Sequence, residues 1–232
     1  MSKKVAIVQS NYIPWRGYFD LINSVDEFIL YDDMQYTIRD WRNRNLIKTA
    51  NGPLWLTIPV EVKGKYFQKI KEVTVSDPQW ARKHWASITH SYSKANHFSA
   101  SKELFAGLYS QAEEKSLSKI NHRFINAICQ LLGINTTISW SMDYEVEGDK
   151  TEKLVNLCKQ AGATHYLSGP AARSYLVEES FTRQGISVSF MDYSGYPEYT
   201  QLYPPFEPGV SVLDLIFNEG PDATRFMKTF AR

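Results

Sequence analysis

The feature that most constrains the fold is a pair of short apolar runs near the N-terminus, separated by one segment of helix length. Residues 5–8 (VAIV) and 27–31 (EFILY) are mostly continuous rather than alternating in polarity, which is typical of strands buried in a parallel sheet. Between them, GYFDLINSVD places Phe19, Ile22 and Val25 at helical spacing. Residues 4–33 therefore have the order and length of a strand–loop–helix–strand unit.

Short strand patterns alternate with helices again in the C-terminal half. We expect strands near residues 136–140, 165–168 and 186–190, and helices over KLVNLCKQAG, ARSYLVEESFTRQG and SVLDLIFNEG, with an irregular tail from 196 to 208. Alternation of this kind predicts an α/β fold with a mainly parallel sheet. A length of 232 residues fits one α/β domain that spans residues 1–232.

The intervening residues have a different pattern. Asn51-Gly52 is a hairpin-turn signal between segments rich in strand-forming residues. Asp77-Pro78 is typical of a helix start, and the chain beyond it is mostly helical to Leu132. We therefore predict an inserted β-hairpin and helical region at about residues 34–132.

Charge and cysteine content exclude several classes of protein. The formal net charge is +1, which disfavours a general nucleic-acid binder. The only two cysteines, Cys129 and Cys158, lie in apolar helical contexts, so we expect two buried free thiols. No stretch approaches the length of a membrane span, and the N-terminal apolar run is too short for a signal peptide. We expect a cytoplasmic protein that does not contact membranes.

Ligands of open α/β sheets bind at the carboxyl ends of the strands. This rule selects, in chain order, Gln9, Asn11, Tyr12, Asp32, Asp33, Ser168, Gly169, Asp192 and Tyr193. The helix start at Gly17-Tyr18 is either an anion site or only a tight turn. With 14% aromatic residues, the chain could also line a sugar-binding or base-binding cleft, and Tyr12, Tyr18, Tyr166 and Tyr175 are the candidates.

Arg42-Asn43-Arg44 could bind phosphate. The two arginines are at i and i+2, on one face if this segment is a strand, and the planar guanidinium suits a diphosphate. The alternative is a surface charge cluster paired with nearby aspartates. Asp32 and Asp33 could orient a sugar hydroxyl or accept a proton from an amine, or could instead cap a helix or pair with the arginines.

The histidines give no metal-ligand spacing, so no metal site is predicted. As a general base, His84 is the first choice and His90 the second. Ser168 lacks the context of a nucleophile elbow, so we interpret Ser168-Gly169 as a binding loop.

The first strand–helix–strand unit resembles that of nucleotidylyltransferase-like proteins, including pantothenate synthetases. The shared pattern is P-x-x-G-Y-x-x-L-I followed by D-x-F-I-L, and it implies a Rossmann-like (nucleotidylyltransferase-like) fold. Those enzymes carry two histidines in the loop, where this chain has Trp15 and Tyr18. The resemblance therefore supports the fold and not adenylyl transfer.

Four blocks across nearly the whole chain resemble a second family. They are QSNYIPWRGYFDLINSVDEFILYDD, WRNRNLIKTANGPLWLTIPV, YLSGPAARSYL and SVLDLIFNEG, in this order. They match the recurrent pattern of the WbqC-like protein family: Q-x-N-Y-x-P-x-x-G-Y, an acidic pair, N/R-x-R with N-G-x-x-W-L-x-x-P, and Y-L-S-G-x-x-x-x-x-Y-L. The resemblance implies a role in bacterial O-antigen or other surface-glycan biosynthesis, such as lipopolysaccharide.

Two functional hypotheses follow from that resemblance. The first is a transferase that N-acylates or aminoacylates a nucleotide-linked amino sugar, with acyl-CoA, acyl carrier protein, aminoacyl-tRNA or ATP plus a free acid as alternative donors. The second is a non-catalytic nucleotide-sugar-binding or scaffold protein of the same pathway, which the missing histidines favour. The tail rich in tyrosine and proline (196–208) makes a homodimer contact worth testing.

Overall fold

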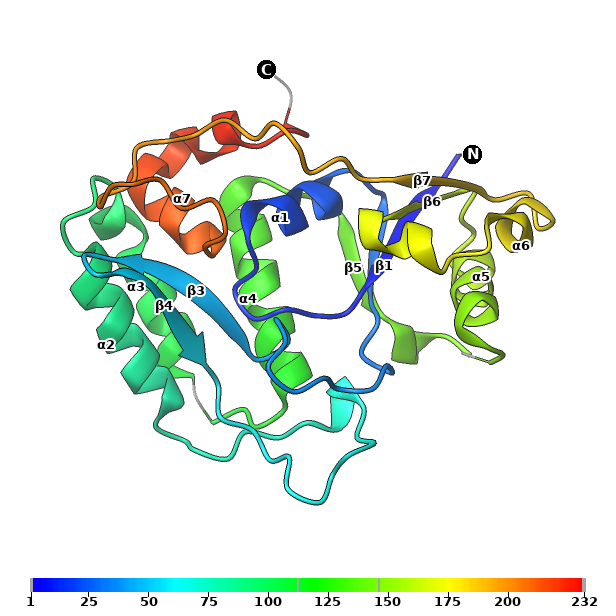
Figure 1. Ribbon diagram of the computed structural model, residues 1–232, viewed down its shortest axis with the longest axis horizontal. Helices are drawn as coiled ribbons and strands as arrows, with labels where there is room; N and C mark the ends of the chain where they lie inside the picture. Colours follow the sequence, from blue (N-terminus) through cyan, green and yellow to red (C-terminus); the bar gives the residue numbers. More distant parts are fainter. Residues whose placement is uncertain (1, 112, 146, 231–232) are drawn as a thin grey trace.

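The computed structural model describes residues 2–111, 113–145 and 147–230. Its centre is a five-stranded parallel sheet in the order β5-β2-β1-β6-β7 (Figure 1). The strands are β1 (Lys4–Val8), β2 (Glu27–Leu30), β5 (Thr137–Trp140), β6 (His165–Ser168) and β7 (Ser187–Phe190). The chain builds outward from β1 through β2 and β5, and then crosses to the other side for β6 and β7. The predicted α/β fold with a mainly parallel, Rossmann-like sheet is confirmed.

Both faces of the sheet are buried, which explains the continuous apolar runs. Successive residues of a strand point to opposite faces. Ala6 and Phe28 accordingly pack into one core cluster, and Val5 and Ile29 into the other. A strand covered on both sides needs apolar side chains at every position.

Helices cover the two faces unequally. Among the described residues they are α1 (Arg16–Asn23), α2 (Trp80–Tyr92), α3 (Phe98–Ser110), α4 (Leu117–Leu132), α5 (Lys150–Gln160), α6 (Glu178–Thr182) and α7 (Val212–Glu219). The larger core cluster includes side chains of α1, α2, α3, α4 and α7, and the smaller one those of α5 and α6. Short 3-10 helices span Ile70–Glu72, Ser141–Asp143, Pro170–Ser174 and Gly220–Phe226.

The predicted hairpin forms between β3 (Arg44–Thr49) and β4 (Gly52–Thr57), an antiparallel pair that closes at the Thr49–Gly52 register. Gly52 has a φ of +98°, a conformation that favours glycine. Figure 1 shows the hairpin beside α2 and α3 at the left of the view, whereas α5 and α6 lie at the right. The insertion thus extends the larger core away from β6 and β7.

Two helix boundaries differ from the prediction. Helix α2 begins at Trp80 rather than Pro78, because the Asp77 carboxylate accepts the amide of Gln79 (2.9 Å) and forms a turn before the helix. The segment ARSYLVEESFTRQG, predicted as one helix, is a 3-10 helix over Pro170–Ser174 followed by α6. Both cysteines are buried free thiols, as predicted, and burial raises the pKa of each to about 12.

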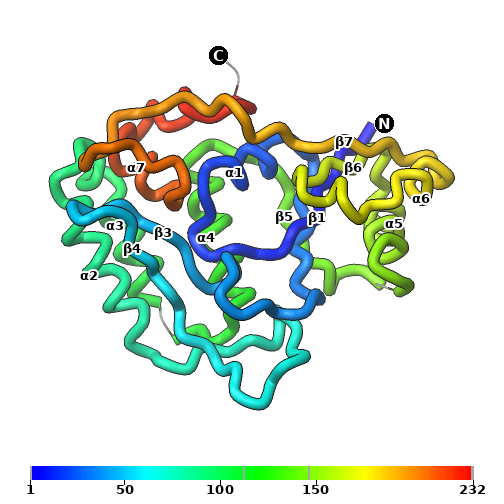
Figure 2. The backbone as a smooth tube through the Cα atoms, viewed as in Figure 1, coloured from blue at the N-terminus to red at the C-terminus, as the bar shows by residue number. Residues whose placement is uncertain are grey.

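The C-terminal segment returns across the molecule. Figure 2 shows it running from β7 over the top of the view to α7 and then back towards the centre. Arg16, in α1, donates to the carbonyls of Pro197 (2.8 Å) and Phe226 (3.0 Å) and so ties both passes of this segment to the first helix. The segment between β7 and α7 is irregular, as predicted.

Candidate functional site

The strand order reverses between β1 and β6, and a cavity of about 420 Å³ lies there. We call it the aromatic pocket because it is lined by the rings of Trp15, Tyr18, Tyr31, Tyr166, Tyr175 and Tyr193. Its polar lining includes Gln9, Ser168 and Lys150. The crevice outside such a reversal is where open α/β sheets bind their ligands.

Seven of the predicted binding residues meet in this pocket: Gln9, Tyr18, Tyr166, Ser168, Gly169, Tyr175 and Tyr193. The Tyr18 hydroxyl donates to the backbone carbonyl of Gln9 (3.0 Å), which fixes the ring against the end of β1. The hydroxyls of Tyr166 and Ser168 lie 3.2 Å apart. Rings with few polar groups are typical of small-molecule sites.

One wall of the pocket depends on Gly17. The ring of Trp15 lies directly over this glycine, so that an added Cβ would lie 2.3 Å from the ring. Trp15 then packs edge-on against Tyr193, with ring centroids 5.1 Å apart, and against Tyr196 at 5.5 Å. The close approach of the ring is thus a local reason for glycine at the start of α1.

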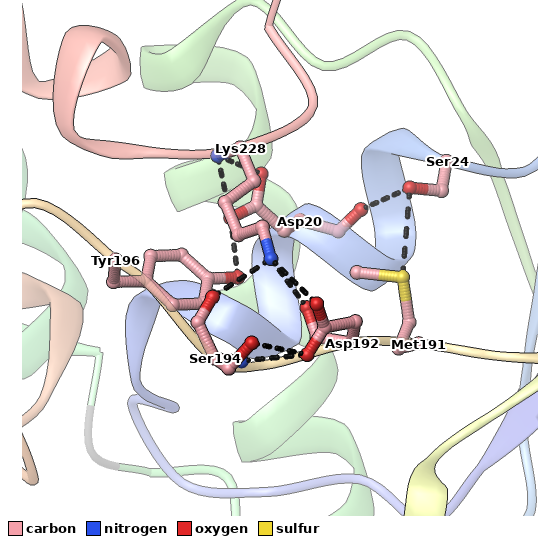
Figure 3. Close-up of polar contacts among 7 residues, drawn as sticks. All are labelled: Asp20, Ser24, Met191, Asp192, Ser194, Tyr196 and Lys228. Atoms are coloured by element: carbon pink, nitrogen blue, oxygen red, sulfur yellow. Dashed lines mark hydrogen bonds and ion pairs between the residues drawn. The ribbon is translucent and has the colours of Figure 1, made fainter.

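The segment that carries Tyr193 is held by a buried carboxylate (Figure 3). Asp20, fully buried in α1, accepts the Tyr196 hydroxyl (2.6 Å) and the backbone amide of Lys228 (3.0 Å). The Lys228 ammonium in turn donates to the carbonyls of Asp192 and Ser194, both at 2.8 Å. The network fastens the loop after β7 and the C-terminal segment to α1, beside the pocket.

A second cavity, of about 260 Å³, adjoins the first. We call it the lysine pocket; it is lined by Tyr31, Asp33, Met34, Lys69, Lys71, Met142, Tyr144 and Lys153. Tyr31 and Met34 line both cavities. The sequence did not single out Tyr31 or the three lysines. The position of Tyr31 at the end of β2, directly before the acidic pair, was the one available signal.

Asp33 lies in the lysine pocket, 2.6 Å from the Lys71 ammonium and 3.5 Å from that of Lys69. Ser141 donates to its other oxygen (3.1 Å). Partial burial pushes the pKa of Asp33 up, but the hydrogen bond and charge of Lys71 outweigh it, and the pKa lies below its usual value. Asp33 is therefore a carboxylate at neutral pH.

Asp32 faces the protein interior instead. It is fully buried and accepts the Ser10 amide (2.9 Å) and the Ser118 hydroxyl. Burial raises its pKa, opposed by those hydrogen bonds. Asn121 donates to the Ser10 hydroxyl (3.0 Å), so this cluster docks α4 onto the loop after β1.

The structure separates the two arginines predicted to act together. Arg42 precedes β3, so the assumption of a shared strand face does not apply, and its guanidinium donates to Asn11 and to Asp40 (3.4 Å). Arg44 instead stacks on Trp55, 4.1 Å from the ring centroid.

Asn43, between them, is buried and donates to the carbonyl of Ile58 (2.8 Å). None of Asn11, Arg42, Asn43 and Arg44 lines either pocket.

His84 lies in the core with both ring nitrogens occupied. Its Nε2 is 3.1 Å from the Thr57 carbonyl and its Nδ1 is 2.9 Å from the Tyr12 hydroxyl, which is 2.6 Å from that of Tyr109. Burial lowers the pKa of His84 to about 4, so it is a neutral imidazole. Tyr12 is fully buried in the same cluster. His90 lines a separate cavity beside the hairpin turn.

Two absences concern only the part of the chain that the structure describes. No group of three histidine, cysteine, aspartate or glutamate side chains there could hold a metal ion. Within the same residues, no helix has both the length and the apolar character needed to cross a membrane.

Comparison with known proteins identifies the family. The model of the WbqC-like protein family matches residues 9–226. The chain is 54% identical over 226 residues to the uncharacterized protein Rv1507c of Mycobacterium tuberculosis, a match that covers 97% of this chain and 98% of the relative. No solved structure matches. The chain belongs to the WbqC-like protein family.

Proposed function

We propose that this protein is a transferase that N-acylates or aminoacylates a nucleotide-linked amino sugar in bacterial surface-glycan biosynthesis of the O-antigen type. The observation that carries the proposal is the aromatic pocket at the reversal of strand order. It offers several flat ring faces and a few polar groups in one cavity. Such a lining suits a sugar or a base, because both stack on rings and present hydrogen-bonding edges.

The chemistry assigns a role to Asp33. The amine nitrogen of the sugar attacks the acyl carbonyl carbon, a C–N bond forms, and the bond to the donor's leaving group breaks. The leaving group takes the electron pair of the broken bond, and the proton lost by the amine passes to it. Asp33 is a carboxylate within the adjoining pocket, so it can accept a hydrogen bond from the amine and orient it. Its lowered pKa makes it a weak base, so its main contribution is positioning.

Family membership supports the pathway rather than the reaction. WbqC-like proteins point to a glycan-related role, and the relative from Mycobacterium tuberculosis is itself uncharacterized. Acyl-CoA, acyl carrier protein, aminoacyl-tRNA and ATP plus a free acid are all compatible donors. We place the reaction in the cytoplasm and expect no metal or nucleic-acid partner beyond a possible tRNA donor.

A non-catalytic nucleotide-sugar-binding protein is the second candidate. It is favoured by the lining of the two pockets, which contains no histidine, and by the lowered pKa of Asp33. His84 and His90, the predicted bases, both lie elsewhere. A protein that only binds its ligand needs the rings and not the base.

Binding is tested by thermal shift with a panel of nucleotides and nucleotide-sugars. Tyr175 lines the aromatic pocket and is 60% exposed, so Tyr175→Ala removes a ring without disturbing the core. We expect it to weaken nucleotide-sugar binding about fivefold to tenfold. Tyr66→Ala is the matched control, because Tyr66 is 75% exposed and lines neither pocket. Equal effects of the two variants would contradict the assignment.

Catalysis is tested by mass detection of the acylated sugar. The protein is incubated with a dTDP- or UDP-amino sugar and each class of acyl donor. A product that gains the acyl mass supports the transferase. Tight binding of nucleotide-sugars without product from any donor favours the second candidate.

A further inference from the structure

The predicted phosphate ligands are committed to other contacts. The guanidinium of Arg42 binds Asn11 and Asp40, and that of Arg44 lies on the ring of Trp55. At the start of α1, the ring of Trp15 covers Gly17. A diphosphate near the aromatic pocket therefore needs other cations.

The lysine pocket supplies them. Lys69, Lys71 and Lys153 line it together with one acid, Asp33, so its lining carries a net charge of +2. The whole chain has a formal net charge of only +1. Lys150, one turn before Lys153 on α5, lines the aromatic pocket, which has no acidic residue in its lining. Positive charge is thus gathered on one side of the ring-lined cavity.

Asp33 fixes two of these ammonium groups and leaves the third. Its ion pairs with Lys71 and Lys69 hold both side chains at the pocket. Lys153 is half-buried and forms no ion pair among the residues that the structure describes. A cation that is already held in place loses less side-chain entropy when a ligand binds. Three ammonium groups around one cavity suit an anion that carries more than one negative charge.

An independent observation comes from Tyr31. This residue is only 7% exposed, and its hydroxyl is buried without a hydrogen-bond partner in the described part of the chain. A buried polar group without a partner costs stability, so its retention calls for an explanation. Tyr31 lines both pockets, at the seam between them. A phosphate oxygen at this seam would accept its hydrogen.

We infer that Lys69, Lys71, Lys153 and the Tyr31 hydroxyl form the diphosphate subsite of the nucleotide-linked sugar, beside the rings of the aromatic pocket. The inference rests on the proposed function and assigns the diphosphate of the ligand to the lysine pocket. Diphosphate chemistry is shared by coenzyme A, so a test must separate the two sources. In this subsite the negative charge of the diphosphate lies among three ammonium groups. The Tyr31 hydroxyl, at the boundary of the lysine and aromatic pockets, donates to a phosphate oxygen.

The test is isothermal titration calorimetry of the full chain with UDP, dTDP, coenzyme A, inorganic pyrophosphate and uridine. Lys153→Ala removes one cation, and Lys159→Ala removes a lysine from the far end of the same helix, outside both pockets. We expect Lys153→Ala to weaken nucleoside diphosphate binding about fivefold to tenfold at low salt and less at high salt. Lys159→Ala should change it less than about twofold.

Tyr31→Phe adds a readout that separates binding from folding. The lost hydroxyl has no partner in the described protein, so thermal stability without ligand should not fall. Affinity for the nucleoside diphosphate should fall about threefold to tenfold. A loss of stability with unchanged affinity would assign the hydroxyl to the fold and overturn its place in the subsite.

The ligand panel decides the occupant. The subsite is supported if UDP or dTDP binds more tightly than uridine and if Lys153→Ala, but not Lys159→Ala, weakens that binding. Uridine binding as tightly as UDP, or equal effects of Lys153→Ala and Lys159→Ala, would overturn it. Coenzyme A or pyrophosphate binding in place of nucleoside diphosphates would overturn the nucleotide assignment. If the subsite is confirmed but no acyl donor gives an acylated product, the transferase proposal is wrong and the diphosphate subsite stands.

Discussion

Replacing Gly17 by alanine tests how tightly the wall of the aromatic pocket is packed. An alanine Cβ at this position would lie 2.3 Å from Cζ2 and 2.5 Å from Cη2 of Trp15. Carbon atoms in contact prefer a separation of about 3.5–4.0 Å. The Trp15 ring must therefore move by about 1 Å or more, against Tyr193 and Tyr196 on its other side.

The cost follows from that displacement. Overpacking of this kind costs about 1–3 kcal/mol, and disturbing two aromatic pairs adds about 0.5–1.5 kcal/mol for each pair lost. Replacing glycine by alanine within a helix stabilises the helix by about 0.5–1 kcal/mol, which offsets part of this cost. We expect Gly17→Ala to lower the free energy of unfolding by about 1–5 kcal/mol, with the upper end reached if both aromatic pairs are lost. We also expect it to weaken ligand binding, because Trp15 and Tyr193 both line the pocket.

Gly107 provides a matched control. It lies within α3, and an added Cβ there would meet nothing within 4 Å. Gly107→Ala should therefore raise the free energy of unfolding by about 0.5–1 kcal/mol through helix propensity alone. Urea denaturation followed by far-UV circular dichroism measures both variants. A Gly17→Ala protein as stable as Gly107→Ala would refute the packing argument.

Two further predictions concern buried polar groups. Because burial lowers the pKa of His84 from 6.5 to about 4, the unfolded chain binds more protons between these pH values, and stability falls by up to about 3 kcal/mol as the pH drops through that window. Urea melts of His84→Gln across the window should lack this slope, while His90→Gln should keep it. Asp20→Asn loses an acceptor for Tyr196 and should cost about 2–3 kcal/mol. Asp192→Asn, at an exposed position of the same network, should cost less than about 1 kcal/mol in the same melts; similar losses in both would contradict the anchoring role of Asp20.

The strands were predictable because burial on both faces leaves a local mark. Residues 5–8 and 28–30 need apolar side chains at each position, whatever their neighbours in the sheet are. The hairpin turn was equally local, since Gly52 needs a positive φ. The break between the 3-10 helix that ends at Ser174 and helix α6 could not be predicted locally, because ordinary helix formers lie on both sides of it.

Half of the candidate site was predictable and half was not. Ser168 ends β6 and Gly169 follows it, and the rule about carboxyl ends places both without knowledge of strand order. The lysines are different. Lys69 lies in an irregular stretch and Lys153 on a polar helix, where lysine usually means only a solvated surface. Only the packing of α5 and of residues 69–71 around the end of β2 brings them together.

The place of His84 could have been read from helical periodicity. Trp80, His84, Ile88 and Tyr92 follow one another at intervals of four, and all four are buried. A histidine within such a stripe faces the core. Reasoning from chemistry alone selected it as a base, whereas its surroundings make it a neutral partner of Tyr12.

The insertion contributes to the site through residues 69–71 and not through its hairpin or α2. His84 of α2 is buried in the larger core between Thr57 of the hairpin and Tyr12, and Arg44 stays on the ring of Trp55. Two other parts of the insertion reach the end of β2: Lys71 pairs with Asp33, and Ser118 of α4 donates to Asp32. The two residues of the acidic pair after β2 therefore have different roles. Asp32 fastens the insertion to the sheet through Ser118, and Asp33 lines the lysine pocket and pairs with Lys71. Because the insertion also supplies Lys69 and Lys71 to that pocket, the geometry of the site depends on how this region docks onto the sheet.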